Sequence, residues 1–170
     1  MKRVTARAAA RIRLLVLDVD GVLTDGGLHY DPSGERAKRF HVHDGLAMVE
    51  ARRAGLALAV VSGRSSAAVA RRLAELGIAE VHQGVRDKCA VLIKLMARFG
   101  LDRAQVAVMG DDLNDLPSMR KAGLALAPRN AVREVRDAAH WVSRRAGGEG
   151  AVREALELLL RARRAWPPRS

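Results

Sequence analysis

A continuous apolar run that ends in two aspartates limits most strongly what this chain can fold into. Residues Leu14–Leu17 include no polar side chain and are too few for a helix, which is typical of a strand buried on both faces of a parallel sheet. Asp18 and Asp20 follow at once, and side chains two residues apart on an extended backbone point the same way. One such aspartate alone is more often a helix cap or a turn former. The pair instead predicts a cation site at the carboxyl end of the strand.

Strand and helix patterns alternate along the rest of the chain, which predicts an α/β fold with a parallel sheet and helices on both of its faces. Gly26-Gly27 and Asp31-Pro32-Ser33-Gly34 punctuate two short stretches and predict a hairpin of residues 28–30 and 37–40. Asp44 is expected to cap the helix that follows it. Further strands are predicted at residues 56–61, 78–82, 105–109, 124–127 and 140–142, and helices at residues 45–51, 67–76, 87–99, 131–137 and 150–164, with a short helix ending at residue 121.

Four chemically apt residues fall at the carboxyl ends of these strands. They are Asp18, Asp20, Ser62 and Asp111. In open α/β sheets the ligand crevice lies beyond the carboxyl ends of the strands. We therefore expect the four side chains to share one site.

The residue types at that site favour phosphoryl transfer. Asp18, Asp111 and Asp115 offer the hard oxygen ligands that Mg²⁺ prefers. Ser62, before Gly63, can give a hydroxyl and backbone N–H groups to a phosphate oxygen, and Lys88 adds a point charge. A carboxylate, a metal and a cationic clamp are the parts that phosphoryl transfer needs. The hypothesis is an aspartyl-phosphate enzyme.

The same residues resemble the four motifs of the haloacid dehalogenase superfamily, in their usual order. The matching segments are Asp18-Val19-Asp20-Gly21-Val22, Ser62-Gly63-Arg64, Lys88 and Gly110-Asp111-Asp112-Leu113-Asn114-Asp115. Tyr30, Gly34, Phe40, the segment His41-Val42-His43-Asp44-Gly45 and the late Gly147-Gly148-Glu149-Gly150-Ala151 resemble, more narrowly, the cap-less 3-deoxy-D-manno-octulosonate 8-phosphate phosphatases. Only 41 residues separate Asp20 from Ser62, so a lid domain does not fit. The resemblance implies a Rossmann-like three-layer fold with a small β-hairpin insert and no cap domain.

The resemblance also implies a role for each matched residue. Asp18 would be the nucleophile and a metal ligand, and Asp20 would be the general acid and base, with its backbone carbonyl on the metal. Asp111 would complete the protein ligands of Mg²⁺, and Ser62 and Lys88 would hold the phosphoryl oxygens. Gly63 and Asp115 would support the site. Contacts with the substrate are implied for Asp20, His41, Val42, His43, Asp44, Gly45, Arg64, Arg72, Lys88 and Asp112.

Three departures from the family pattern concern the substrate. Family members often carry Arg where this chain has His43, and some have a basic residue where Val49 stands. Residues 127–130 also differ from the small, acidic sequence common there. The predicted substrate is a sugar-acid phosphate, 3-deoxy-D-manno-octulosonate 8-phosphate, with a nine-carbon sialic-acid-type 9-phosphate as the alternative. The former implies a role in lipopolysaccharide biosynthesis, and the family implies a homotetramer in which a neighbouring subunit helps to cover the site.

Length and cysteine content predict one cytoplasmic domain. The 170 residues, with 49% hydrophobic content, have room for one core. We divide the chain into a basic lead-in at residues 1–11, a phosphatase domain at residues 12–164 and a tail at residues 165–170. No apolar run approaches the roughly 18 residues of a membrane span, and the single Cys89 excludes an internal disulfide. We expect no membrane partner.

The net charge of +11 raises nucleic-acid binding as a function of another class. Residues 1–13 and 161–170 hold nine basic and no acidic residues, so the rest of the chain carries 21 basic and 19 acidic residues. Aromatic residues make up 3% of the chain, which excludes a base-stacking platform. We expect solvated basic tails and no specific nucleic-acid partner.

A phospho-receiver domain is a further alternative, because such modules also use Asp, Mg²⁺, Ser or Thr, and Lys on a parallel sheet. The order of the parts separates the two. A receiver's acceptor Asp follows a central strand well after an acidic pair, whereas here that later strand ends in Ser62. A module that binds through its basic tails without turnover is the other rival.

Overall fold

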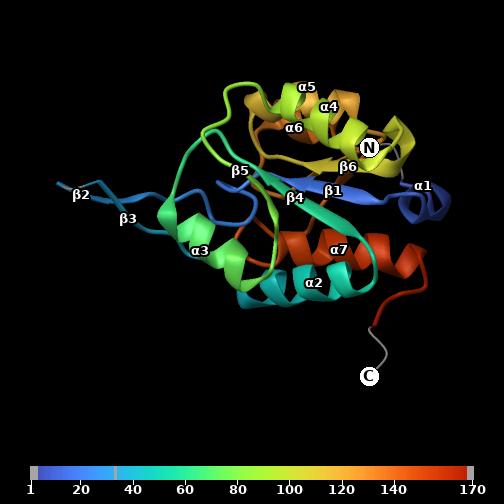
Figure 1. Ribbon diagram of the computed structural model, residues 1–170, viewed down its shortest axis with the longest axis horizontal. Helices are drawn as coiled ribbons and strands as arrows, with labels where there is room; N and C mark the ends of the chain where they lie inside the picture. The colour runs from blue at the N-terminus through green and yellow to red at the C-terminus, as the bar shows by residue number, and fades with distance from the viewer. Residues whose placement is uncertain (1–3, 33, 168–170) are drawn as a thin grey trace.

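A six-stranded parallel sheet forms the centre of the molecule, which is a computed structural model describing residues 4–32 and 34–167. The strand order is β5-β4-β1-β6-β7-β8 (Figure 1). The strands are β1 (Leu14–Leu17), β4 (Ala57–Val61), β5 (Glu80–His82), β6 (Val106–Met109), β7 (Leu124–Ala127) and β8 (Trp141–Val142). The predicted parallel sheet is confirmed.

Helices cover both faces of this sheet, as Figure 1 shows. One apolar core lies between the sheet and α1 (Ala6–Ala10), α2 (Val42–Arg53), α3 (Ala67–Glu75) and α7 (Ala151–Ala162). A second core lies between the other face and α4 (Lys88–Phe99), α5 (Leu116–Lys121) and α6 (Arg133–Ala138). Two 3-10 turns, η1 (Arg103–Gln105) and η2 (Leu113–Asp115), flank β6.

Strand β1 is apolar throughout because it is buried on both faces. Leu15 and Leu17 pack into the first core, and Leu14 and Val16 pack into the second. From β1 the chain passes to β4 and β5 on one side and then returns to β6 on the other side of β1. This reversal places the crevice between β1 and β6, at their carboxyl ends.

A two-stranded hairpin follows β1 and projects from the body of the molecule (Figure 1). It consists of β2 (His29–Asp31) and β3 (Gly34–Ala37), which pair antiparallel. The predicted second strand, residues 37–40, was wrong by several residues. The chain has already left the hairpin there, because Phe40 instead pairs with Thr24 and packs against the first core.

The predicted cap of α2 was also wrong. His41 is the N-cap, and its Nδ1 accepts a hydrogen bond from the backbone N–H of His43 at 3.2 Å. Asp44 lies within the first turn of α2, and its Oδ1 accepts from the backbone N–H of Arg153 at 2.6 Å. Helices α2 and α7 pack together, so the buried Asp44 caps the start of its neighbour instead of its own helix.

The two basic ends pack against the body in part. Helix α1 contacts α7, and Ala9 is fully buried between them. At the other end the guanidinium of Arg153 lies 4.6 Å from the centre of the Trp166 ring. Lys2, Arg3, Ser33 and Arg169 lie outside the described residues. The division of the chain at residues 11 and 164 stays a prediction.

None of the helices in the described part of the chain combines the length and the apolar character needed to cross a membrane.

Candidate active site

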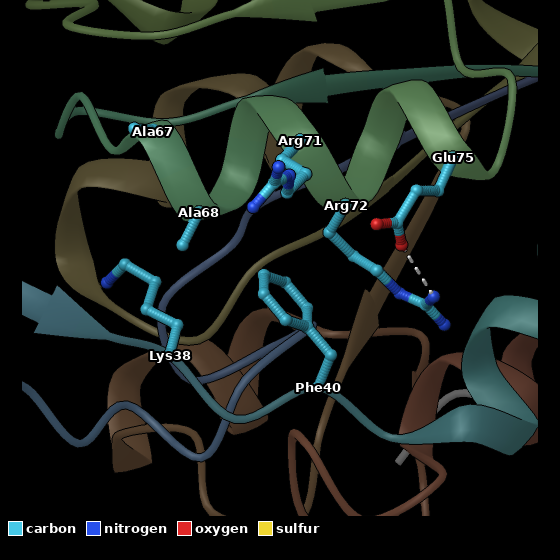
Figure 2. A pocket seen from close by; sticks show the side chains of 7 residues that line it. All are labelled: Lys38, Phe40, Ala67, Ala68, Arg71, Arg72 and Glu75. Atoms are coloured by element: carbon cyan, nitrogen blue, oxygen red, sulfur yellow. Dashed lines mark hydrogen bonds and ion pairs between the residues drawn. The ribbon is translucent and has the colours of Figure 1, made fainter.

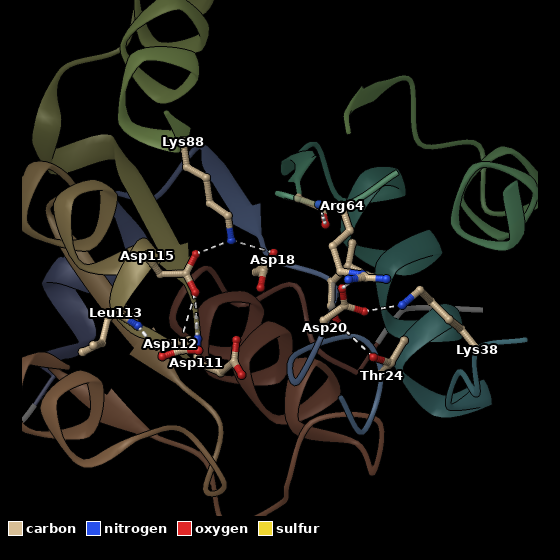
Figure 3. Close-up of polar contacts among 12 residues, drawn as sticks. Asp18, Asp20, Thr24, Lys38, Arg64, Lys88, Asp111, Asp112, Leu113 and Asp115 are labelled. Carbon is tan, nitrogen blue, oxygen red and sulfur yellow. Dashed lines mark hydrogen bonds and ion pairs between the residues drawn. The ribbon is translucent and has the colours of Figure 1, made fainter. Parts of the chain in front are cut away.

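Three carboxylates from the ends of two neighbouring strands meet in one cluster (Figure 3). Asp18 follows β1, Asp111 follows β6, and Asp115 lies at the end of η2. One oxygen from each lies within 4.8 Å of the others. Of the residues expected at the strand ends, the cluster includes Asp18 and Asp111, and Asp115 joins them from the motif that follows β6.

The turn after β1 needs a glycine at position 21, because the Asp111 carboxylate occupies the space that a side chain there would fill. Gly21 adopts a φ of +80°, and a Cβ built on it would lie 2.0 Å from Asp111 Oδ2. Any side chain at this position would displace the Asp111 carboxylate.

Lys88 is the cation that balances part of this charge. It is the first residue of α4, and Asp87 before it caps the helix by accepting from the N–H of Ala90 at 2.9 Å. Lys88 Nζ lies 2.8 Å from an oxygen of Asp18 and 2.8 Å from an oxygen of Asp115. Burial opposes the charge of Lys88, but the two carboxylates outweigh it and raise the pKa of the amine. Lys88 therefore stays protonated.

Burial and crowding shift the carboxyl groups strongly. Burial, together with the negative charge of Asp115, raises the pKa of Asp18 to about 6, although Lys88 opposes the rise. Burial and the charges of Asp18, Asp115 and Asp112 raise the pKa of Asp111 to about 8. The cluster thus holds more negative charge than its protein surroundings stabilise.

The donor set fits a divalent cation. When all three carboxylates are ionised, they and one ammonium leave two negative charges uncompensated, and Asp111 Oδ1 is buried with no hydrogen-bond partner among the described residues. Hard carboxylate oxygens of this kind suit Mg²⁺. An ion of charge +2 at this point would neutralise the cluster.

Asp115 holds Lys88 and the backbone of residues 111 and 112 in place through hydrogen bonds. Its Oδ1 accepts from Lys88, and its Oδ2 accepts from the backbone N–H groups of Asp111 and Asp112 at 3.0 and 3.3 Å. Since both of its oxygens are engaged, Asp18 and Asp111 are left as the side chains with oxygens to offer a metal. The supporting role predicted for Asp115 agrees with this geometry.

The side chain of Asp20 faces a different way. It is not part of the three-carboxylate cluster, and its Oδ1 lies 2.5 Å from Lys38 Nζ while its Oδ2 lies 3.8 Å from Arg64 Nε. Any contact of Asp20 with the metal therefore depends on its backbone carbonyl, as the resemblance implies. Sequence reasoning missed Lys38, which looked like one of several basic residues in the hairpin.

A cavity of about 260 Å³ joins these groups. Ser62 follows β4, is buried, and accepts a hydrogen bond from the backbone N–H of Arg64 at 3.3 Å. The cavity is lined by Asp18, Asp20, Gly26, Ser62, Gly63, Arg64, Lys88, Asp111, Asp112 and Asn114. All predicted catalytic and metal-binding residues line this cavity. Gly26 and Asn114 also line it, although neither was assigned a role in the site from the sequence.

A larger cavity of about 490 Å³ lies between the segment after the hairpin and α3. Figure 2 shows Lys38 and Phe40 on one side and Arg71, Arg72 and Glu75 of α3 on the other. Arg72 Nη1 forms an ion pair with Glu75 at 3.2 Å. Two further residues of α3, Ala67 and Ala68, complete the lining.

The predicted substrate segment His41 to Gly45 does not line either cavity. His41 and His43 line a third hollow, of about 470 Å³, beside Arg144 and Arg153, and Val42 is exposed. Of these five residues, only Gly45 lies close to a residue outside the segment that is predicted to contact the substrate. A Cβ on Gly45 would lie 2.4 Å from Arg72 Nη2. Within one chain these residues are therefore not gathered around the carboxylates.

Known proteins resemble this chain over most of its length. The family of haloacid dehalogenase-like hydrolases matches residues 77–156. The 3-deoxy-D-manno-octulosonate 8-phosphate phosphatase of Haemophilus influenzae is 42% identical over 151 residues, which are 89% of this chain and 84% of that protein. The phosphatase of the same name from Escherichia coli K12 is 42% identical over 154 residues, or 91% and 82% of the two chains.

A solved structure shows the same likeness in three dimensions. It is the 3-deoxy-D-manno-octulosonate 8-phosphate phosphatase of Moraxella catarrhalis, in complex with a magnesium ion, a phosphate ion and a KDO molecule. The two chains are 39% identical and superpose with a TM-score of 0.91 over 95% of this chain and 92% of that one.

Proposed function

This chain belongs to the 3-deoxy-D-manno-octulosonate 8-phosphate phosphatases, within the haloacid dehalogenase-like hydrolases, and on that premise we propose that Asp18 accepts the phosphoryl group of that sugar-acid phosphate. The predicted family, fold class, phosphatase activity and use of Mg²⁺ are confirmed. The residue roles remain our proposal. The observation that supports them best is the meeting of Asp18, Asp111 and Lys88 in one cluster.

Asp18 acts as the nucleophile. With a pKa of about 6 it is largely ionised at neutral pH, and Lys88 holds its Oδ1 at 2.8 Å. An oxygen of Asp18 attacks phosphorus, the bond from phosphorus to the sugar oxygen breaks, and a phospho-aspartate forms. Water then attacks the same phosphorus and releases Asp18 with inorganic phosphate.

Asp18 and Asp111 would hold Mg²⁺ through their side chains, with the backbone carbonyl of Asp20 as a third ligand. When bound, the ion neutralises charge on the phosphoryl oxygens and on the carboxylates around them. Ser62 and Lys88, which both line the smaller cavity, hold the remaining phosphoryl oxygens.

Asp20 moves the protons of both steps. Its carboxyl group lines the smaller cavity and gives a proton to the sugar oxygen as that oxygen leaves. The resulting carboxylate then takes a proton from the attacking water. The same residue thus serves as acid and as base, in agreement with microscopic reversibility.

The sugar acid lies toward Arg64 and Arg72. Arg64 borders the smaller cavity and Arg72 the larger one. Guanidinium groups bind carboxylates by paired, charge-assisted hydrogen bonds. The substrate carboxylate would therefore lie in the larger cavity, with the phosphate at the carboxylate cluster.

A homotetramer and a cytoplasmic location complete the proposal. The projecting hairpin exposes Leu28 and Tyr30, which are 42% and 59% accessible, and apolar groups gathered on a projection favour contact with other subunits. In a tetramer, a neighbouring chain could bring its segment at residues 41–43 to the site. Light scattering on the purified protein measures the oligomeric state directly.

A phosphate-release assay tests the proposed substrate. We expect Mg²⁺-dependent turnover of 3-deoxy-D-manno-octulosonate 8-phosphate with a higher kcat/KM than for hexose phosphates, and no turnover in EDTA. The Asp18→Asn variant controls for contaminating phosphatases. A preference for a nine-carbon sialic-acid-type 9-phosphate would replace the substrate but keep the chemistry, and equal rates on hexose phosphates would reject a sugar-acid specificity.

A further inference from the structure

Asp20 lies between two cations, of which one directly follows the hairpin in the chain and the other contacts it. Lys38 directly follows β3, and its Nζ contacts Asp20 Oδ1 at 2.5 Å (Figure 3). Arg64 Nε lies 3.8 Å from Asp20 Oδ2, and the guanidinium of Arg64 donates a hydrogen bond to the hydroxyl of Tyr30 in β2. The proton-transfer residue is therefore tied to the hairpin by two routes.

We propose that Lys38 is a positioning residue, which holds the carboxyl group of Asp20 toward the leaving oxygen and couples it to the hairpin. This inference rests on the proposed function, because it takes Asp20 as the acid of the first step. It adds a residue that neither the motifs nor the carboxylate cluster includes.

Burial distinguishes this ion pair from the surface pairs of the molecule. The side chain of Lys38 is 1% exposed and that of Asp20 is 22% exposed. The next residue, Arg39, pairs with Asp25 at 3.0 Å but keeps 59% of its side chain in solvent. Solvent screens an exposed pair and leaves it mobile, whereas a desolvated pair with good geometry fixes both side chains.

The pair also lies where the two cavities approach each other. Asp20 lines the cavity of about 260 Å³ that holds the carboxylates, and Lys38 lines the cavity of about 490 Å³ beside α3. Lys38 donates to Oδ1 of Asp20, which leaves Oδ2 to carry the proton that is transferred to the leaving oxygen. The torsion angle of the carboxyl group is therefore set from the side of the larger cavity. A shift of the hairpin would therefore move the catalytic acid.

The leaving group provides a test that needs no sugar substrate. p-Nitrophenolate leaves without a proton, whereas phenolate, a much stronger base, requires the acid. The constant kcat/KM reports the steps up to phospho-aspartate formation, and therefore isolates the acid step from the later base step. For Lys38→Met we expect kcat/KM to fall about 10- to 100-fold on phenyl phosphate and less than about 3-fold on p-nitrophenyl phosphate, because a misplaced acid loses most of its effect.

The ratio of the two constants is the decisive quantity, because it does not depend on how much of a preparation is folded. Lys38→Gln keeps a donor for Asp20 without the charge and should restore part of the phenyl phosphate rate. Arg39→Met is the matched control on the same segment and should leave both constants unchanged. Equal losses on the two aryl phosphates would overturn the inference, as would a variant that changes only the KM for 3-deoxy-D-manno-octulosonate 8-phosphate.

The test of the proposed substrate can fail without affecting the test of the role of Lys38. If the wild-type chain hydrolyses aryl phosphates but not the sugar-acid phosphate, the substrate is wrong and the ratio still decides the role of Lys38. If wild type hydrolyses no phosphate monoester with Mg²⁺, both proposals are overturned.

Discussion

Asp111→Asn should stabilise the metal-free protein while removing its response to Mg²⁺. The unfolded chain ionises this residue near the ordinary pKa of 3.8, whereas burial and neighbouring carboxylates keep the folded form protonated up to about pH 8. The folded pKa is raised, so the stabilising effect of proton binding is complete below 3.8 and is lost as the pH rises through about 8. Replacing the acid by a neutral amide removes this pH-dependent cost.

The magnitude follows from the pKa shift and the exposure of the site. Neutral pH lies about three pH units above the unfolded pKa of 3.8, and each unit corresponds to about 1.4 kcal/mol. The substitution can therefore raise the free energy of unfolding by at most about 4 kcal/mol. Because the cluster borders a cavity that solvent can reach, screening reduces the expected gain to about 1 to 2 kcal/mol. An amide at this position can also donate to the carboxylates of Asp18 and Asp115.

Chemical denaturation from about pH 4 to about pH 8 measures this effect. In EDTA, the difference in unfolding free energy between Asp111→Asn and wild type should be near zero at the acidic end and should grow with pH. Excess Mg²⁺ should stabilise wild type by about 2 to 3 kcal/mol at roughly a hundred times its Kd, and the variant by much less. Asp137→Asn, an exposed carboxylate 3.5 Å from Arg133, should change neither quantity. A variant less stable than wild type in EDTA at every pH would refute the reasoning.

Two further predictions concern stability. Asp44→Ala should lower the free energy of unfolding by about 1 to 2 kcal/mol because the first turn of α7 loses its cap, whereas Asp44→Asn should keep the bond to Arg153 and remain close to wild type in thermal unfolding. Burial raises the pKa of Asp44, so the neutral amide should suit the site best at alkaline pH, and equal losses in both variants would contradict the capping role. Gly147→Ala should cost about 1 to 3 kcal/mol, since its Cβ would lie 1.8 Å from the carbonyl oxygen of Gly21. Gly27→Ala, which meets only a flexible carboxylate at 3.2 Å, is the control, and equal thermal stability of the two variants would disprove the packing argument.

The sequence predicted the sheet and the carboxylate cluster because both depend on local patterns. Apolar runs that end in Asp18, Ser62 or Asp111 mark the strand ends, and parallel strands bring those ends to one edge. The supporting role of Asp115 followed from the same motif. Each of these inferences needs only the chain order of strands and helices.

From the sequence, the cap of α2 and the strand β3 were predicted at the wrong positions, and Lys38 was missed. The cap and Lys38 depend on contacts with segments that are distant in the sequence. Asp44 caps α7 because α2 and α7 pack together, a contact across 109 positions that no local pattern indicates. The hairpin strands are short and β2 is exposed throughout, so hydrophobic periodicity did not place β3. Lys38 stands among other basic residues and becomes buried only because the chain folds back onto Asp20.

Chemical identification of the covalent intermediate tests the account most directly. Wild type and Asp20→Asn are quenched with acid during turnover of p-nitrophenyl phosphate, reduced with borohydride and digested for mass spectrometry. The leaving group of this substrate needs no acid, so the variant should be slowed only in the breakdown of the intermediate. We predict that residue 18 is recovered as homoserine, the reduction product of an aspartyl phosphate, with more of it in the variant. Homoserine at another aspartate, or none in either enzyme while phosphate is being released, would contradict the assignment of Asp18 as the nucleophile.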